Sequence, residues 1–556
     1  MNKYSSAVGW PAMMNSLTPT RAPALLLLIG IISGLLLARK IEAPVALSLP
    51  AMLLSATALW FSIRQNPLWL YAFIVAATLA FWVYGSIRLA ETPTAADLSA
   101  PIREATLHCK IERVLQADSP FNNTSGIARV ITANPTSRLS PGARIYYKFK
   151  QPDVIEIKRG TEIVATGILK CIPHDIDPDS FEGYLKTTGV HYRFYRSNNI
   201  QVLKPPSTFE QFCQTMKHRF MGFLKLGAPK EGTLANIYVA MLLGQKTALS
   251  AEQKDRFRMT GTMHFFAISG LHIGVIATVI AQFLILVRVP RRWSPFLGLP
   301  LLYLYVEITG ASPSAVRAFL MAAFFWASFA LARQRSSFAA LCGSAVFVLF
   351  FKPEQLWSIG FQLSYTVVLS ILIFGLPFYE RVSRRLSPFA YLPKNNWTRS
   401  QHAYAWIQDK VLLLFAISFS AWLASAPLSA AFFGYISPGA VFLNMILVNL
   451  AAITISTGVI ALSLALAGLD IVAGFLNHGA WLTIHTMDSA VIASLEISGM
   501  MIECPNFPKW AAYSALLAYF GLLLALNSTR PQSSMRFWWL PPVMIIGCLL
   551  FGILAQ

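Results

Sequence analysis

The chain has 556 residues, of which 55% are hydrophobic and only 13% charged, and its formal net charge at pH 7 is +20. Apolar runs of about 20 residues, long enough to cross a bilayer, follow one another along most of its length. This composition excludes a soluble enzyme fold for most of the chain and predicts a polytopic α-helical membrane protein. The positive excess indicates basic loops that set the membrane topology, and it also suits a polyanionic partner.

The first half of the chain changes from apolar to polar and back. Three apolar runs in residues 1–99 predict three transmembrane helices, near residues 22–38, 44–63 and 67–89. The segment 100–205 is polar, and turn-forming residues separate five runs of strand-forming residues in it, at 105–115, 125–133, 143–150, 161–169 and 190–202. Five short strands in so short a segment predict a small β-barrel, such as an OB-fold, inserted between membrane segments.

Aromatic and basic residues alternate in two of these predicted strands. The candidate nucleic-acid ligands are Tyr147, Lys148, Lys150, Arg193 and Arg196, because aromatic rings stack on bases and cations bind the sugar–phosphate backbone. Alternating aromatics also fill the cores of barrels, so the pattern alone leaves both interpretations open.

Two cysteines, Cys109 and Cys171, lie in the same polar segment. A disulfide between them is chemically permissible if the segment lies outside the cytoplasm. The predicted barrel therefore carries a candidate disulfide, which could form only if the membrane topology places the barrel outside the cytoplasm.

A positively charged junction, residues 206–261, follows the predicted barrel. Within it, Ser250-Ala-Glu-Gln253 is a capping box that predicts a short helix over residues 251–260. Arg256 and Arg258 lie near the end of this helix, with Phe257 and Met259 beside them. The composition suits a helix on the membrane surface and equally a solvated helix.

The remaining segment, residues 262–556, is again apolar and predicts nine to ten helices. The runs lie near 262–287, 293–308, 313–332, 336–351, 355–375, 411–433, 439–466, 471–497, 510–526 and 537–554. Alternate loops between them hold thirteen lysines and arginines, and the other loops hold only Lys352 and Lys509. The positive-inside rule places the basic loops in the cytoplasm and the predicted barrel outside it. Arg39 and Lys40, in a predicted outer loop, are the exception.

Polar residues interrupt the first of these apolar runs. In a helix His264, Ile268 and His272 share one face, with Ser269 beside it and Gly270 and Gly274 near it. Polar groups are costly in hydrocarbon, so this stripe should face either neighbouring helices or a water-filled path.

Two later runs also carry polar groups. Arg317 either pairs with Glu307 across a hairpin or offers a cation to a phosphate at the outer mouth of a path. Gln362 and Ser364 place an amide and a hydroxyl within a predicted span. Arg317, Gln362 and Ser364 are therefore candidates for the lining of a path.

The sequence lacks the common catalytic motifs. It contains no G-x-x-x-x-G-K-[ST] loop, no H-E-x-x-H motif and no H-x-H pair. We therefore expect no nucleotide-driven motor, metal site, cofactor or enzymatic activity in this chain.

Ordered blocks of sequence carry a family resemblance. They are Leu242-Leu-Gly-Gln-Lys-Thr-Ala-Leu-Ser250, Ala267-Ile-Ser-Gly-Leu-His-Ile-Gly274, Gly310-Ala-Ser-Pro-Ser-Ala-Val-Arg-Ala318, Gly360-Phe-Gln-Leu-Ser364, and Ser425-Ala-Pro-Leu428 with Asn444 and Asn449. In this order they resemble the ComEC family of DNA-internalisation competence proteins, with the predicted barrel where that family has an OB-type domain.

The resemblance implies a channel in the bacterial inner membrane that takes up single-stranded transforming DNA. The external barrel would receive the strand and the polytopic competence domain would conduct it. The residues expected to line the path are His264, Ser269, Gly270, His272, Gly274, Arg317, Gln362 and Ser364.

The resemblance also implies partners. An external DNA receptor, a cytoplasmic helicase-like motor and a separate nuclease are expected, the last because the metallo-β-lactamase-type domain of many members does not follow in this sequence. Association into a homo-oligomer stays open. The alternatives are a small-solute or proton-coupled transporter with an accessory external domain, and a scaffold that recruits competence proteins without conducting DNA.

Overall fold

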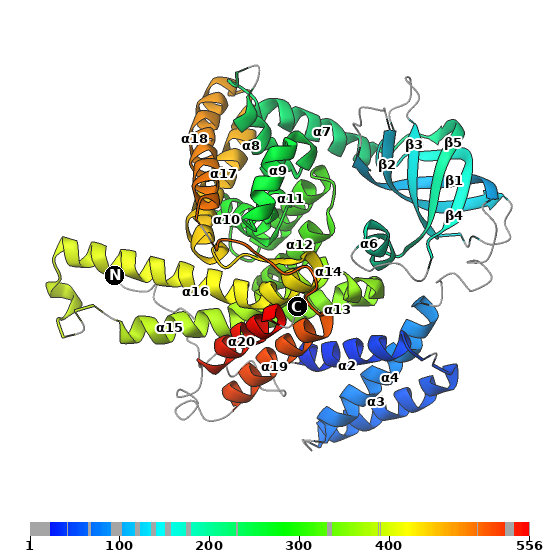
Figure 1. Cartoon of the computed structure of the whole chain (residues 1–556), viewed down its shortest axis with the longest axis horizontal. Coiled ribbons are helices and arrows are strands. Elements are labelled where there is room, and N and C mark those ends of the chain that lie inside the picture. Colours follow the sequence, from blue (N-terminus) through cyan, green and yellow to red (C-terminus); the bar gives the residue numbers. More distant parts are fainter. Residues whose placement is uncertain are drawn as a thin grey trace.

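The computed structural model describes most of the chain. The described residues are 23–41, 43–64, 68–89, 103–116, 123–134, 139, 141–150, 157–173, 180–229, 232–330, 336–386, 388–389, 391–497, 499–528 and 539–554. They form a helical body with a β-barrel on one side and a group of three N-terminal helices below the barrel (Figure 1).

The three N-terminal helices are α2 (Pro23–Ala38), α3 (Ser48–Ile63) and α4 (Trp69–Leu89), where the sequence predicted three spans. Helix α2 packs closely on α4 because it carries two glycines one turn apart. A Cβ atom at Gly34 would lie 2.5 Å from the carbonyl oxygen of Thr78, so only glycine permits this approach. On its other side α2 buries Ile31 and Leu35 in one apolar cluster with Phe338 and Leu341 of α13 (Ser337–Phe351).

The five predicted strands are confirmed. They are β1 (Arg103–Gln116), β2 (Asn123–Asn134), β3 (Arg144–Lys150), β4 (Glu162–Cys171) and β5 (Val190–Lys204). They close into a barrel in the order β1-β2-β3-β5-β4, with β3 and β5 parallel and the other neighbours antiparallel. A short helix, α6 (Phe181–Thr187), lies between β4 and β5. Alternate residues such as Leu107, Ile145 and Phe194 fill the interior.

The disulfide considered between Cys109 and Cys171 is not formed. Cys109 lies opposite Ile163 near one end of β4, whereas Cys171 is the last residue of that strand. At about 3.4 Å per residue, the two cysteines are roughly 27 Å apart along the barrel, far beyond the distance of about 7 Å that a disulfide can bridge. Cys109 instead belongs to the barrel core, where burial raises its pKa to about 12.

The helical body follows the order expected from the apolar runs. Its elements are α7 (Thr208–Leu224), α8 (Thr233–Leu243), α9 (Ala251–Met259), α10 (Gly270–Leu286), α11 (Ser294–Ile308), α12 (Pro313–Ala330), α13, α14 (Ile359–Ser370), a π-helical turn (Ile371–Gly375), α15 (Leu376–Arg385), α16 (Arg399–Phe433), α17 (Ala440–Leu466), α18 (Asp470–Leu495), α19 (Lys509–Ser528) and α20 (Leu540–Leu554). Among the described residues, five helices are long and apolar enough to cross a membrane, and shorter apolar helices accompany them. The chain is thus a multi-pass membrane protein.

The predicted capping box of α9 is confirmed. Ser250 Oγ accepts from the Gln253 backbone N–H at 3.1 Å, and Gln253 Oε1 accepts from the Ser250 N–H at 3.0 Å. One face of the helix packs against the helical body, while residues such as Arg258 and Met259 on the other face are exposed. Phe257 is only 2% exposed, and its ring meets the edge of Phe266 with 4.6 Å between the ring centroids.

The continuous helix predicted over residues 262–287 is wrong. Helix α9 ends at Met259, one 3₁₀ turn covers Met263–Phe266, and the backbone is extended at Ala267 and Ser269 before α10 begins at Gly270. The start of α10 is stabilised locally, because His272 Nδ1 accepts from the Ser269 N–H at 3.4 Å and lies 3.1 Å from Ser269 Oγ. His264 and His272 therefore do not share one helical face.

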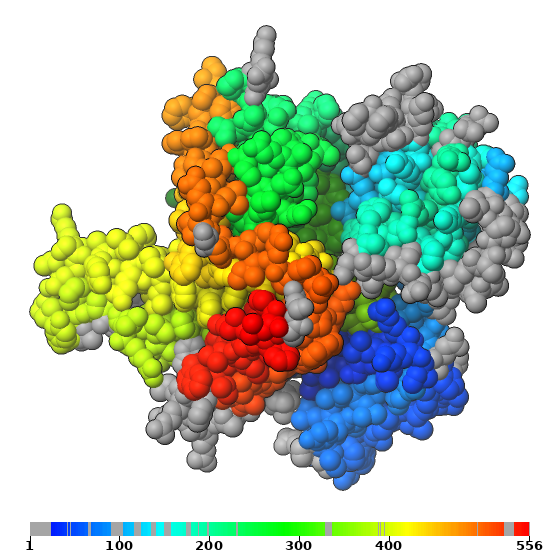
Figure 2. All heavy atoms as spheres, in the orientation of Figure 1, coloured from blue at the N-terminus to red at the C-terminus, as the bar shows by residue number. Residues whose placement is uncertain are grey.

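The barrel lies against the helical body (Figure 2). Two ion pairs join them. Arg159, just before β4, places Nη1 3.0 Å from Glu307 Oε2 at the end of α11. Arg144 of β3 places Nη1 3.2 Å from Glu354 Oε1, in the turn after α13. Away from the barrel, α15 and the first part of α16 project as a hairpin (Figure 1).

Candidate functional site

A large cavity, about 2720 Å³ in volume, begins between the barrel and α7 and continues into the helical body. Residues of β1, of the segment before β4 and of α7 line its barrel end. Residues of α10, α12, α14 and α16 line its continuation. The cavity therefore connects the barrel with the interior of the membrane segment.

The lining follows each of these four helices as a stripe. On α10 this stripe comprises Gly270, Gly274, Ala277, Thr278, Ala281, Gln282 and Ile285, residues three and four apart that share one face, and Leu271 and Ile273 also line the cavity near the start of the helix. From Gly270 to Ile285 this stripe is roughly 22 Å long at 1.5 Å per residue. That length approaches the hydrocarbon thickness of a bilayer, about 30 Å.

The cavity is strongly cationic. Among the described residues its lining includes seven basic side chains and two acidic ones, which are Arg113, Lys158, Arg159, Lys217, Lys246, Arg258, Arg317, Glu210 and Glu307. Both glutamates already have partners. Glu307 binds Arg159, and Glu210 accepts from the Ser207 hydroxyl at 2.7 Å and lies 3.9 Å from Lys110.

Several of these cations have no counter-ion within the described part of the chain. Arg113, Lys217, Lys246 and Arg258 form no ion pair with any described acidic residue. Burial lowers the pKa of Lys217, and burial together with repulsion from Arg113 lowers the pKa of Lys246. Unneutralised positive charge in a partly enclosed space attracts an anion.

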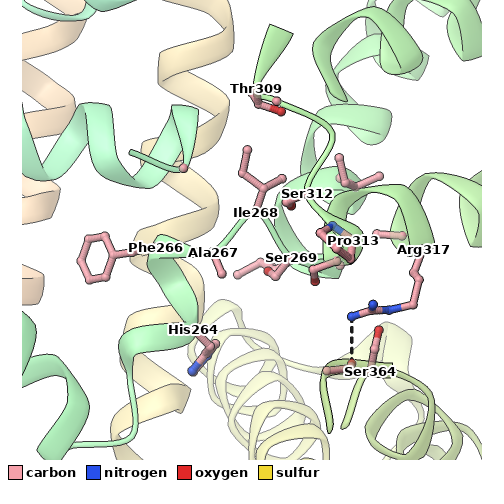
Figure 3. A pocket seen from close by; sticks show the side chains of 18 of the residues that line it. His264, Phe266, Ala267, Ile268, Ser269, Thr309, Ser312, Pro313, Arg317 and Ser364 are labelled. Atoms are coloured by element: carbon pink, nitrogen blue, oxygen red, sulfur yellow. Dashed lines mark hydrogen bonds between the residues drawn. The ribbon is translucent and has the colours of Figure 1, made fainter. Parts of the chain in front are cut away.

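Six of the eight residues predicted to line the path face the cavity. They are His264, Ser269, Gly270, Gly274, Arg317 and Ser364, and Figure 3 shows four of them from close by. They reach the cavity from the segment before α10, from α10 itself, from α12 and from α14.

Arg317 lies in the wall and is 5% exposed. Its Nη2 donates to the Gly360 carbonyl oxygen at 2.8 Å, and its Nε has no hydrogen-bond partner. The pairing with Glu307 that the sequence left open is not formed, because Glu307 binds Arg159 of the barrel.

His272 and Gln362, the other two residues predicted to line the path, do not line this cavity. His272 is fully buried and binds Ser269 at the start of α10. Gln362 donates from Nε2 to the Leu356 carbonyl oxygen at 3.1 Å, and its Oε1 accepts from the Tyr513 hydroxyl at 3.0 Å. Both side chains hold neighbouring segments together.

The residues predicted to bind nucleic acid on the barrel differ in how far they are available at its surface. Tyr147 is fully buried and stacks on Phe149 with 4.6 Å between the ring centroids, so it is unavailable to stack on a base. Arg193 pairs with Glu182 of α6. Lys148 and Arg196 are exposed, and the side chain of Lys150 lies outside the described part of the chain. The alternating aromatics thus form the barrel core.

Most of the cations of the cavity were not selected from the sequence. Lys246 lies in the first of the family blocks, and Arg258 lies at the end of the predicted short helix. Both could therefore have been proposed as site residues from the sequence. Arg113 and Lys158 stand in ordinary strand and turn contexts. They become part of the site only because the barrel docks beside α7.

The described residues contain no group of three or more His, Cys, Asp or Glu side chains arranged to hold a metal ion. The cavity combines a largely apolar wall with cations and hydroxyl groups, and the cations can attract an anion.

Comparison with known proteins shows that most of the membrane segment matches a known protein family. The family model described as "Competence protein" matches residues 241–529, which include all the blocks from Leu242 onward. The chain is similar to ComE operon protein 3 of Bacillus subtilis (strain 168), with 29% identity over 232 residues, covering 41% of this chain and 30% of that protein.

A second relative is an uncharacterized protein of Aquifex aeolicus (strain VF5), with 32% identity over 146 residues, covering 26% of this chain and 34% of that protein. The chain thus matches about a third of the length of each of these relatives. No solved structure matches it. Because the family model covers more than half of the sequence, the chain belongs to the competence protein (ComEC) family.

Proposed function

We propose that this protein is a channel through which one strand of DNA crosses the bacterial inner membrane during natural competence. The observation that carries the proposal is the cavity, which follows four helices through the body and carries seven basic side chains against two glutamates among the described residues. Membership of the competence protein family supports the same role.

The distribution of charge along the cavity suits a polyanion. Six of the seven basic residues come from the barrel and the junction, and only Arg317 comes from the helices from α10 onward. A concentration of cations at one end raises the local concentration of DNA and its rate of association.

Further along, the wall is mostly apolar, with large side chains such as Trp326 and Trp422, and the hydroxyl groups of Thr278, Ser364, Ser418, Ser425 and Ser429 lie among them. These groups form hydrogen bonds to phosphate without holding it by charge. Conduction requires that the strand bind strongly enough to enter the channel and weakly enough to leave it. The charged wall near the barrel suits entry, and the uncharged wall beyond it suits release.

The proposal places the barrel outside the cytoplasm. The loops on one side of the helical segment hold thirteen lysines and arginines, against two on the other. The positive-inside rule assigns the basic side to the cytoplasm, so α10, which starts on the opposite side, begins at the outer face. A strand then meets the barrel and its neighbouring cations first.

Partners complete the proposed function. The sequence contains no nucleotide-binding loop, so we attribute the pulling force to a separate cytoplasmic helicase-like motor. Delivery of DNA to the outer face and degradation of the other strand are assigned to an external receptor and a separate nuclease.

The fate of labelled duplex DNA in a deletion strain tests the proposal. Label bound outside, which added nuclease removes, should persist without the protein. Label protected inside the cell should disappear and should return when the gene is restored. Undiminished internal label in the deletion strain would contradict the channel, and it is the result that a small-solute transporter predicts.

A further inference from the structure

Three helices begin around the same part of the cavity. Helices α10, α12 and α14 start after Ser269, Ser312 and Ser358, and all three serines line the cavity. Figure 3 shows Ser269, Ser312 and the start of α12 grouped near Arg317. These are alternate helices of the body, so they run in the same direction and present their N-termini together.

Helix N-termini attract anions. The first backbone N–H groups of a helix have no partner within it, and the aligned peptide dipoles place roughly half a positive charge there. The three helices have 17, 18 and 12 residues, long enough for the effect to develop fully. Three such ends around one space add their fields.

Arg317 provides independent evidence that an anion belongs at this position. The side chain is 5% exposed, yet no described acidic residue pairs with it, and its Nε lacks a hydrogen bond. A buried guanidinium without a counter-ion is unfavourable. Its single hydrogen bond, to the Gly360 carbonyl oxygen at 2.8 Å, fixes its orientation at the start of α14.

We propose that Arg317 and the N-termini of α10, α12 and α14 form a binding site for one phosphate group of the DNA backbone. This inference rests on the proposed function and deepens it. The lysines near the barrel are long and flexible and collect the strand. The site at Arg317 is rigid, so it holds one phosphodiester at a defined position before the strand continues along α10 and α16.

The binding of short oligonucleotides to the full-length protein, purified in a maltoside detergent that lacks phosphate, tests the role of Arg317. The probes are a fluorescent thymidine 12-mer with phosphodiester linkages and the same 12-mer with uncharged methylphosphonate linkages. Arg317→Gln should weaken phosphodiester binding at least about tenfold, the change expected for loss of one charged hydrogen bond. Arg317→Lys should fall between Gln and wild type, because it keeps the charge but not the planar fork.

The uncharged probe and a distant arginine provide the controls. Methylphosphonate binding should be the same in wild type and both variants. Arg291→Gln, in the exposed segment between α10 and α11, should bind the phosphodiester probe like wild type. Inorganic phosphate should compete with the phosphodiester probe for wild type and less well for Arg317→Gln. Equal phosphodiester affinity in wild type and Arg317→Gln would overturn the site.

A second pair of variants tests the helix N-termini. Ser312 Oγ accepts from the Ala315 N–H at 3.3 Å, and Asp and Asn are both good residues at such a capping position. Ser312→Asp and Ser312→Asn should therefore unfold at similar temperatures. Only Ser312→Asp should weaken phosphodiester binding, because it adds a negative charge where the phosphate would lie. If the two variants bind equally well, the helix ends take no part.

The site and the channel are separable in cells. Suppose that purified Arg317→Gln binds the oligonucleotide normally and that DNA uptake in cells still requires the protein. This pair of results would overturn the phosphate site and leave the channel intact. DNA uptake in the deletion strain would overturn the proposed channel function. The oligonucleotide affinities would still show whether Arg317 binds a phosphate group.

Discussion

Individual side chains show why residue type alone did not determine role. Tyr147 and Lys148 are neighbours in β3, and both matched the pattern of a nucleic-acid surface, yet alternation along the strand buries the first and exposes the second. Arg317 had two interpretations, and the position of Glu307 beside Arg159 decides between them. In each case the deciding contact comes from a segment distant in sequence.

Tyr147 should tolerate loss of its hydroxyl but not of its ring. The hydroxyl is buried without a hydrogen-bond partner, so Tyr147→Phe should keep or raise stability. Tyr147→Ala leaves a cavity in the core, and such changes cost about 3–5 kcal/mol. Thermal unfolding of the purified protein checks both, and a Tyr147→Phe variant with weakened oligonucleotide binding would show that the hydroxyl contacts DNA after all.

Lys246 should give DNA binding a pH dependence. Its pKa is lowered from 10.5 by burial and by Arg113, so its charge is lost at lower pH than that of an ordinary lysine. Oligonucleotide affinity should therefore fall as the pH rises toward 10.5, and Lys246→Arg should reduce this fall because arginine stays charged. Lys246→Gln should bind more weakly at neutral pH and show a shallower salt dependence. Identical pH profiles for wild type and Lys246→Arg would assign the titration to another group.

At the scale of elements, strands were easier to predict than helix ends. Alternating residues and turn signals located all five strands closely, because side-chain period and loop chemistry are local properties. The break before α10 was not predicted because residues 261–274 contain no proline. In addition, the capping box of α10 pairs Ser269 with His272, whereas the residue at the position of His272 is usually Glu or Gln. The cavity itself was beyond prediction, since it depends on which helices become neighbours.

His272 should behave as a structural residue at the start of α10. His272→Ala removes the acceptor for the Ser269 N–H and leaves a hole in a fully buried position, so protein abundance and unfolding temperature should both fall. His272→Gln restores a capping acceptor and should recover part of the loss. Immunoblots of membranes, read beside DNA uptake, check this. A His272→Ala variant that is abundant but inactive in uptake would instead assign His272 to the path.

At the scale of the whole molecule, two units that look separate in sequence form one site. The barrel provides Arg113, Lys158 and Arg159, and the competence segment provides the helices that continue the cavity. The ion pairs of Arg159 with Glu307 and of Arg144 with Glu354 hold the barrel beside this cavity. Composition predicted a membrane protein whose positive charge suits both basic loops and a polyanionic partner, and the docked barrel brings three of its basic residues to the cavity.

The most direct test of the central claim is photo-crosslinking during DNA uptake, with a photoreactive amino acid placed on either face of α10. Ala281 lines the cavity, whereas Phe283, two residues away, is 57% exposed on another face of the helix. The account predicts that the strand crosslinks to the probe at position 281 and not to the probe at position 283. Crosslinks of equal yield at both positions, or none at 281 while uptake proceeds, would contradict it.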